Sequence, residues 1–119
     1  MPRRKSADKC SILPWLSAKP DSREGRFTQI GNSLLLSPKF KELTTGARSL
    51  YISMAMEAGG QREFEFPRTS AIKYGFPTTT FERLLKELLS VGCIVLKSSG
   101  KNTREANVYT FSVDYFKDT

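Results

Sequence analysis

The sequence contains no histidine, so the commonest general base and metal-binding side chain is missing. Its two cysteines, Cys10 and Cys93, lie far apart and do not have the spacing of metal ligands. There is no glycine-rich phosphate loop, no Gly-x-Ser-x-Gly motif and no Cys-x-x-Cys motif. The carboxylates are spread along the chain, where solvation accounts for them. We therefore expect neither catalysis nor a bound metal or cofactor.

Long apolar runs are also missing, and nothing approaches the length of a membrane-spanning segment. Met1–Lys5 resembles the charged start of a signal peptide, but no apolar region of suitable length follows it. Cys93 lies in an apolar run, where a cysteine usually acts as a small buried hydrophobic residue. These features favour a reducing, cytoplasmic setting without membrane contact.

Positive charge is abundant and unevenly distributed. The 119 residues include 19 Lys or Arg and 12 Asp or Glu, a formal net charge of +7. Residues 68–104 carry seven basic and two acidic side chains, whereas residues 31–67 are balanced at four of each. Such a charge favours an anionic partner, with nucleic acid ahead of an acidic protein or a membrane surface.

The basic stretch contains the pattern of two helices joined by a turn. Residues 69–88 predict a short helix, a turn centred on Gly75 and a longer amphipathic helix. On a helical projection one stripe of the second helix is apolar and is expected to be buried; it consists of Phe81, Leu84, Leu85 and Leu88. This is the helix-turn-helix layout, in which the second helix can enter the major groove of DNA.

Polar and cationic residues lie opposite the apolar stripe, and Thr79, Arg83 and Lys86 are expected to face the major groove. A solvated face is the alternative. Thr79 with Glu82 also fits a capping box, so helix initiation explains part of the pattern. Glu87, expected on the exposed side, would be repelled by phosphate.

Further candidates surround this helix. Arg68 and Lys73 are expected to contact the DNA backbone, and Thr78 and Thr80 either contact DNA or cap the helix. The polar loop after residue 97 adds basic groups that can reach phosphate or the minor groove. The complete set of candidate DNA-binding residues is Arg68, Lys73, Thr78, Thr79, Thr80, Arg83, Lys86, Lys97, Lys101, Asn102 and Arg104.

Three segments have the pattern of strands that form a small antiparallel sheet. Arg62–Phe66 alternates apolar and charged residues, with Phe64 and Phe66 on one face. Cys93–Lys97 and Asn107–Val113 are β-rich runs around the basic loop and predict a hairpin. A hairpin directly after a helix-turn-helix indicates a winged helix, an α/β (α+β) class with three to four helices.

The segment before the first of these strands is expected to be scaffold. Ser37 and Pro38 predict the N-cap and first residue of a short helix, with Phe40 and Leu43 facing inward. A second helix begins at Thr44 or Thr45 and ends at Gly59-Gly60; its apolar stripe is Ala47, Leu50, Tyr51, Met54, Ala55 and Ala58. Phe27–Ile30 alternates and predicts a strand that is broken by Gly31-Asn32.

The chain divides into residues 1–25, expected to be a flexible basic arm, and residues 26–119, the winged-helix domain. Three cations of the arm would add non-specific attraction for DNA: Arg3, Arg4 and Lys5. Trp15 lies in an apolar island of the arm, Ile12–Leu16. It either folds back on the domain or anchors a partner protein, because buried tryptophan often dominates interface energy.

Two segments, Phe27–Leu35 and Phe40–Tyr51, have a familiar pattern. They resemble the N-terminal winged-helix domain of replication initiators from bacterial plasmids and related mobile elements. There, Phe-x-x-Ile-Pro…Leu precedes a helix with Leu-Ser/Thr-x-x-Ala-Arg/Lys-x-Leu-Tyr. Gly31 stands where that pattern often has proline. Thr80–Ile94 is similar to the end of the second helix in many winged helices.

The resemblance covers about residues 26–113, and only Leu43–Tyr51 is somewhat specific. It implies sequence-specific binding of duplex DNA at a replication origin or an operator. Four questions stay open: whether the protein regulates transcription, whether it forms a homodimer, whether it binds RNA, and whether the chain is a fragment of a longer initiator. A winged helix that binds a protein through Trp15 and the Phe64/Phe66 strand is a further alternative.

Overall fold

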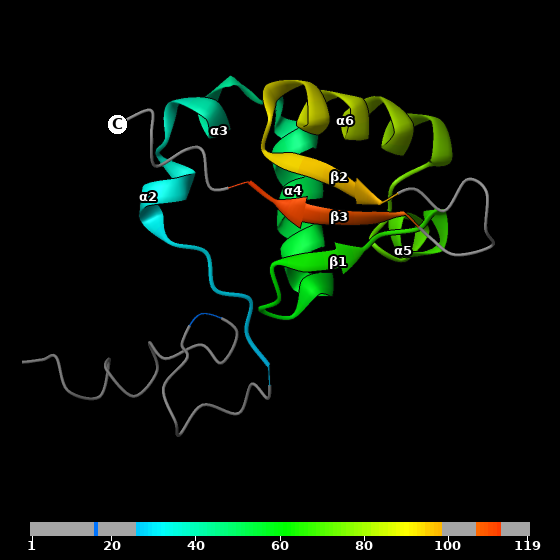
Figure 1. Cartoon of the computed structure of the whole chain (residues 1–119), viewed down its shortest axis with the longest axis horizontal. Helices are drawn as coiled ribbons and strands as arrows, with labels where there is room; N and C mark the ends of the chain where they lie inside the picture. Colours follow the sequence, from blue (N-terminus) through cyan, green and yellow to red (C-terminus); the bar gives the residue numbers. More distant parts are fainter. Residues whose placement is uncertain (1–15, 17–25, 99–106, 113–119) are drawn as a thin grey trace, which may run out of the picture.

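The computed structural model describes residue 16, residues 26–98 and residues 107–112. Within these residues the chain has five helices and three strands, so the expected mixed α+β class is confirmed. In chain order the elements are α2 (Asn32–Leu35), α3 (Pro38–Glu42), α4 (Thr45–Ala58), β1 (Glu63–Glu65), α5 (Arg68–Lys73), α6 (Thr78–Val91), β2 (Ile94–Ser98) and β3 (Val108–Phe111) (Figure 1).

The three strands form one antiparallel sheet in the order β1-β3-β2. Phe64 of β1 and Leu96 of β2 both pair with Tyr109 of the central strand, and the β2–β3 register shifts between Leu96 and Ser98. The alternation expected around β1 is confirmed, because Phe64 and Phe66 are buried and the glutamates of β1 are exposed. At β1 the sheet therefore has an apolar face toward the core and a polar face toward solvent, whereas Val95 and Leu96 of β2 are exposed.

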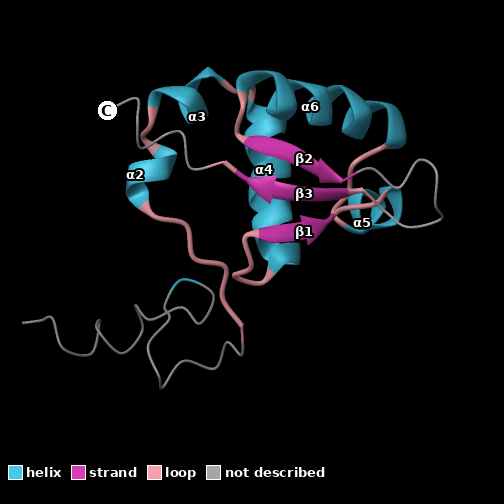
Figure 2. Ribbon diagram, viewed as in Figure 1, coloured by secondary structure: helices cyan, strands magenta, loops and turns pink. Residues whose placement is uncertain are grey.

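Helix α4 lies behind the sheet and α6 crosses one end of α4 (Figure 2). The predicted stripe of α4 fills the space between them: Leu50 and Met54 are fully buried, and only Ala55 is half-buried. Thr44 caps the helix by accepting a hydrogen bond from the Ala47 N–H at 3.3 Å. At the other end Gly59 adopts a φ of 60°, a left-handed conformation that glycine favours.

The short helix α3 begins as expected. Ser37 accepts a hydrogen bond from the Phe40 N–H at 3.3 Å, and Pro38 occupies the first helical position. Phe40 and Leu43 are both buried, and the ring of Phe40 packs edge-on against Tyr51 at 5.6 Å between centroids. This contact joins α3 to α4.

The predicted strand at Phe27–Ile30 is wrong. Residues 26–30 have no regular structure, and among the described residues their backbone makes no hydrogen bond to the sheet. They run away from the sheet in Figure 1, and an alternating pattern does not form a strand without a neighbouring backbone to pair with. Gly31, expected to be a simple break, is instead the N-cap of α2. This helix was not expected, which is why the described residues contain five helices rather than three or four.

Candidate nucleic-acid interface

Helix α5, a short turn and helix α6 form as the sequence predicts. The turn closes through hydrogen bonds from the Gly75 N–H to the Ile72 carbonyl at 3.0 Å and from the Phe76 N–H to the Ala71 carbonyl at 2.9 Å. Gly75 has a φ of 91°, which residues with a Cβ rarely adopt. The glycine is therefore required for α6 to leave α5 at this angle.

One face of α6 is buried and the opposite face is open to solvent. Phe81, Leu84 and Leu88 are buried as expected, and Leu85 is half-buried. Thr79, Arg83 and Lys86 are exposed on the other side. Within residues 26–98 and 107–112, neither Arg83 nor Lys86 forms an ion pair or a side-chain hydrogen bond. Their charges are thus available to an external anion.

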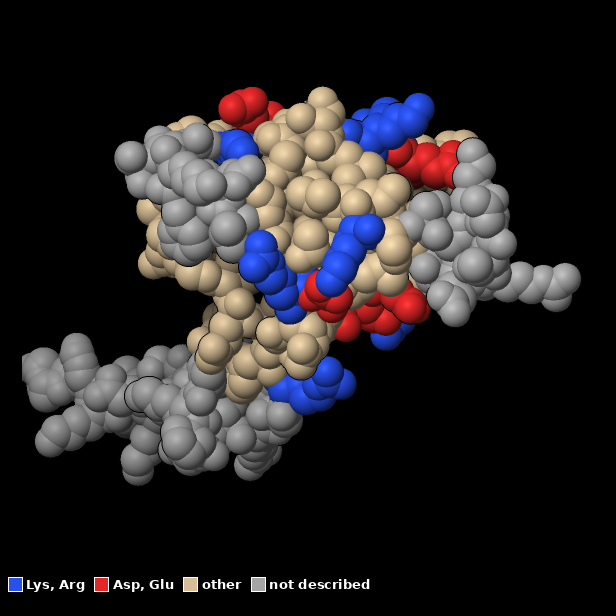
Figure 3. All heavy atoms as spheres, viewed as in Figure 1, with Lys and Arg blue, Asp and Glu red and all other residues tan. Residues whose placement is uncertain are grey.

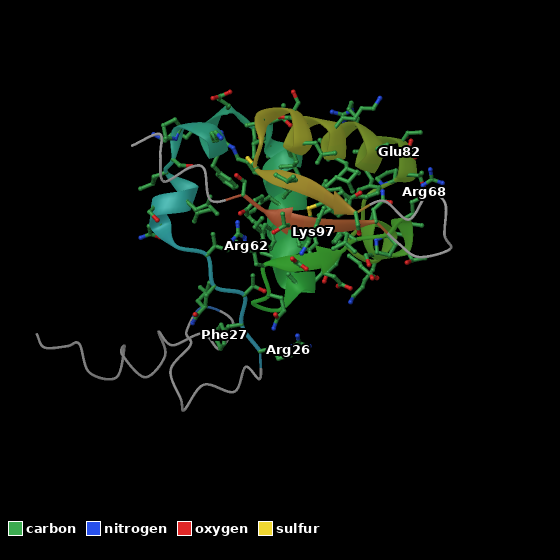
Figure 4. The ribbon with its side chains drawn as sticks, viewed as in Figure 1. Arg26, Phe27, Arg62, Arg68, Glu82 and Lys97 are labelled. Atoms are coloured by element: carbon green, nitrogen blue, oxygen red, sulfur yellow. The ribbon has the colours of Figure 1, made fainter. Side chains whose placement is uncertain are left out.

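Arg68 and Lys73 lie at the two ends of α5 and both have carboxylate partners. Arg68 Nη2 lies 2.6 Å from Glu82 Oε2 on α6 (Figure 4). Lys73 Nζ lies 3.4 Å from Glu57 Oε1 at the end of α4. Both cations are well exposed, at 69% and 64%, and ion pairs in such settings stabilise by only ~0–1 kcal/mol. A phosphate could therefore compete for either cation.

Glu57 links the end of α4 to α5 and the turn that follows it through hydrogen bonds. It accepts hydrogen bonds from the Tyr74 hydroxyl at 2.8 Å, from Lys73 Nζ at 3.4 Å and from the Ser70 hydroxyl at 3.5 Å. The hydrogen bond from Tyr74 lowers the pKa of Glu57. Burial raises the pKa of Tyr74, and the contact with Glu57 raises it further. These contacts fix the helix that precedes α6.

The expected capping box of Thr79 with Glu82 is wrong. The N-cap of α6 is Pro77, which makes no side-chain capping hydrogen bond, and the helix begins at Thr78. Thr79 therefore lies inside the first turn, and Glu82 binds Arg68 instead of the helix start. Capping consequently does not explain the threonines: Thr78 and Thr79 are exposed, and Thr80 is half-buried.

Glu87 does not lie on the open side of α6, contrary to expectation. It is half-buried and accepts hydrogen bonds from the Thr44 N–H at 2.7 Å and the Thr44 hydroxyl at 2.8 Å. This carboxylate stabilises the N-terminus of α4 and does not oppose a phosphate from the exposed face. The contact is not predictable from local sequence, because its partners are 43 residues apart.

Among the loop candidates, only Lys97 lies in the described part of the chain. It is the fourth residue of β2, and its ammonium group binds Glu63 on β1 across the polar face of the sheet. Figure 3 views this face and shows Lys and Arg side chains beside Asp and Glu side chains rather than one continuous basic patch. Other predicted residues lie outside the described ranges: Arg3, Arg4, Lys5, Trp15, Lys101, Asn102 and Arg104.

Three parts of the predicted interface nevertheless share one end of the molecule. In Figure 1, α5, the beginning of α6, the end of β2 and the start of β3 all lie at the right. Segments that are distant in sequence thus place α5, the first turn of α6 and the described ends of β2 and β3 on the same side. The protein-binding alternative loses support, because Phe64 and Phe66 are buried in the core.

The chain matches no protein-family model, no curated protein and no solved structure. None of the described helices has the length and apolar character that a membrane crossing requires. Nor do three or more Cys, Asp or Glu side chains of the described residues gather where they could hold a metal ion.

Proposed function

We propose that this protein binds double-stranded DNA sequence-specifically, as a winged helix whose α6 enters the major groove. The observation that carries the proposal is the exposed face of α6. There Arg83 and Lys86 have no partner among the described residues and Thr79 lies beside them. Attraction to phosphate and recognition of bases both require cations without carboxylate partners on the second helix of a helix-turn-helix, which here is α6.

The side chains of α6 suit different parts of DNA. The Arg83 guanidinium can donate two hydrogen bonds to a guanine, and the Thr79 hydroxyl and methyl can contact a base edge. Lys86, two turns from the start of the helix, suits a phosphate. In this arrangement Arg83 recognises sequence and Lys86 adds affinity.

The three cations that have carboxylate partners, Arg68, Lys73 and Lys97, would add phosphate contacts on either side of α6. A guanidinium has five N–H donors, so Arg68 can keep Glu82 and still donate to a phosphate. Lys73 and Lys97 would exchange a carboxylate for a phosphate. The hairpin of β2 and β3 would serve as the wing, with Lys101, Asn102 and Arg104 as its predicted contacts.

The biological role that we favour is that of a replication initiator-like factor of a plasmid or another mobile element, as the resemblance implies. A transcriptional regulator of the same architecture would use the same surface. Mapping the bound site in its native DNA distinguishes them, since an initiator binds at an origin and a regulator at a promoter.

The test is selection of bound sequences from a random duplex pool at physiological salt, followed by affinity measurements on the selected site. We expect Arg83→Ala to weaken binding by ~1–3 kcal/mol and to relax the preference at one position. Lys41→Ala removes an equal charge from α3, which lies beside the C-terminal end of α6 rather than beside its first turns, and should leave base preference unchanged. A pool without any enriched sequence would refute the proposal.

A further inference from the structure

The face of α6 that we assign to DNA also carries a carboxylate, Glu82. This residue lies one turn after Thr78, just before Arg83, and is 46% exposed. Its position in the first turns of α6 places it where major-groove-binding helices contact base edges. A negative charge there needs an explanation, because it would be repelled by phosphate.

Arg68 supplies the first part of the explanation. Its Nη2 binds Oε2 of Glu82 at 2.6 Å, so the two side chains together carry no net charge. The Arg68 side chain extends from α5 toward α6 at this point (Figure 4). Repulsion between Glu82 and the DNA backbone is thereby reduced, and the carboxylate is held in one orientation.

The second carboxylate oxygen of Glu82 indicates what the carboxylate can bind. Among the described residues, Glu82 Oε1 accepts no hydrogen bond. An ionised carboxylate has acceptors only. In the major groove cytosine presents an amino donor at N4, whereas adenine places the acceptor N7 beside its N6 amino group, so a carboxylate suits cytosine better. Thr78 and Thr79 beside it carry hydroxyls that can both donate and accept, so they discriminate less among bases.

We propose that Glu82 is a specificity-determining residue that accepts a hydrogen bond from the N4 amino group of a cytosine, with Arg68 as its positioning residue. The inference rests on the proposed DNA binding through α6. In this proposal the Glu82 carboxylate recognises one base pair of the site, and this pair is adjacent to the one recognised by Arg83. Arg68 then serves two groups at once, Glu82 and a phosphate.

The experiment compares the sites selected from a random duplex pool by the wild-type protein, Glu82→Gln and Glu82→Ala. The wild type should require cytosine at one position by about tenfold over the other bases. Glu82→Gln should shift that preference toward adenine, whose N6 and N7 suit an amide, and Glu82→Ala should abolish it. Preference at every other position should persist.

Glu63→Gln is the matched control, because Glu63 is also an exposed carboxylate bound to one cation but lies on β1. It should leave the selected site unchanged. Arg68→Ala should weaken the cytosine preference as well as overall affinity. Loss of a phosphate contact alone would lower affinity but leave the cytosine preference unchanged.

Two results would overturn the assignment. The first is that both Glu82 variants select the wild-type site. The second is that both bind all duplexes more tightly with the same base preference, which would make Glu82 only a source of repulsion. Failure of the wild-type protein to enrich any sequence is distinguishable from these results. It would refute DNA recognition itself, and the role of Glu82 with it.

Discussion

Glu87 lies on α6 but accepts two hydrogen bonds from Thr44, at 2.7 and 2.8 Å, at the N-terminus of α4. A carboxylate there satisfies a donor that the helix leaves unpaired and interacts favourably with the helix dipole. We expect Glu87→Ala to lower the free energy of unfolding by ~1 kcal/mol, measured by urea denaturation. The neighbouring Lys86→Ala should change it by less than about 0.5 kcal/mol. Equal effects of the two changes would contradict this role.

The Glu57 cluster gives stability a pH dependence. The pKa of Glu57 is lowered from its ordinary value of 4.5, chiefly by the hydrogen bond from Tyr74, so folding favours the ionised carboxylate. This contribution is complete above pH 4.5 and is lost as the pH falls through the lowered pKa. Glu57→Gln and Tyr74→Phe should therefore destabilise the protein at neutral pH but approach wild-type stability in acid. Urea denaturation across the acid range tests this, and a constant difference would contradict it.

At the scale of elements, Gly46 of α4 packs against Leu84 of α6. A Cβ on Gly46 would lie 3.1 Å from Leu84 Cδ2 and 3.2 Å from Cδ1, tighter than most such contacts. Leu84→Ala should cost ~2–5 kcal/mol through the cavity that it leaves. The effect of Gly46→Ala on the free energy of unfolding should be more favourable by ~0.5–3 kcal/mol in the Leu84→Ala protein than in the wild type, because the Leu84 side chain no longer obstructs the added Cβ. A double-mutant cycle by urea denaturation measures the coupling, and additive effects would show that the helices are not in close contact.

Local sequence signals predicted most of the elements. Ser37-Pro38, Thr44 and the glycines at 59 and 75 mark helix ends by chemistry that acts within a few residues, and the structure confirms each of them. The four-residue helix α2 has no side-chain cap to mark it. Phe27–Ile30 has the strand pattern, but pairing depends on a distant backbone that the pattern does not contain.

The candidate site was predictable to a smaller extent. Periodicity was enough to place Arg83 and Lys86 opposite the buried stripe of α6. The partners of Arg68, Lys73 and Lys97 lie 14, 16 and 34 residues away, so only the folded chain brings them together. The charge count of a segment therefore overstates the number of cations that are open to DNA.

The segment that carries most of the family resemblance, Leu43–Tyr51, has structural roles. Thr44 caps α4, Leu50 and Tyr51 are buried, and Arg48 donates to the Leu43 carbonyl at 3.1 Å. The resemblance there reflects how a helix begins and packs. The functional proposal consequently depends on α6 and not on this segment.

For the whole molecule, the salt dependence of DNA binding indicates how many cations contact phosphate. About five contacts predict that log affinity falls with log salt concentration at a slope of about −4 to −5. If Arg68, Lys73 and Lys97 all kept their carboxylates and made no phosphate contact, about two of the five contacts would remain and the slope would be about −2. Titration of a labelled duplex at several salt concentrations distinguishes the two slopes, and an affinity independent of salt would contradict phosphate binding altogether.

The most direct test of sequence-specific DNA binding is the ratio of the affinities of the wild-type protein for its selected duplex and for a scrambled duplex of equal length. Competition titration at physiological salt measures this ratio. The proposed arrangement predicts that the selected duplex binds at least about a thousandfold more tightly, and that Arg83→Ala reduces this preference. Equal affinity for the two duplexes would contradict the central claim.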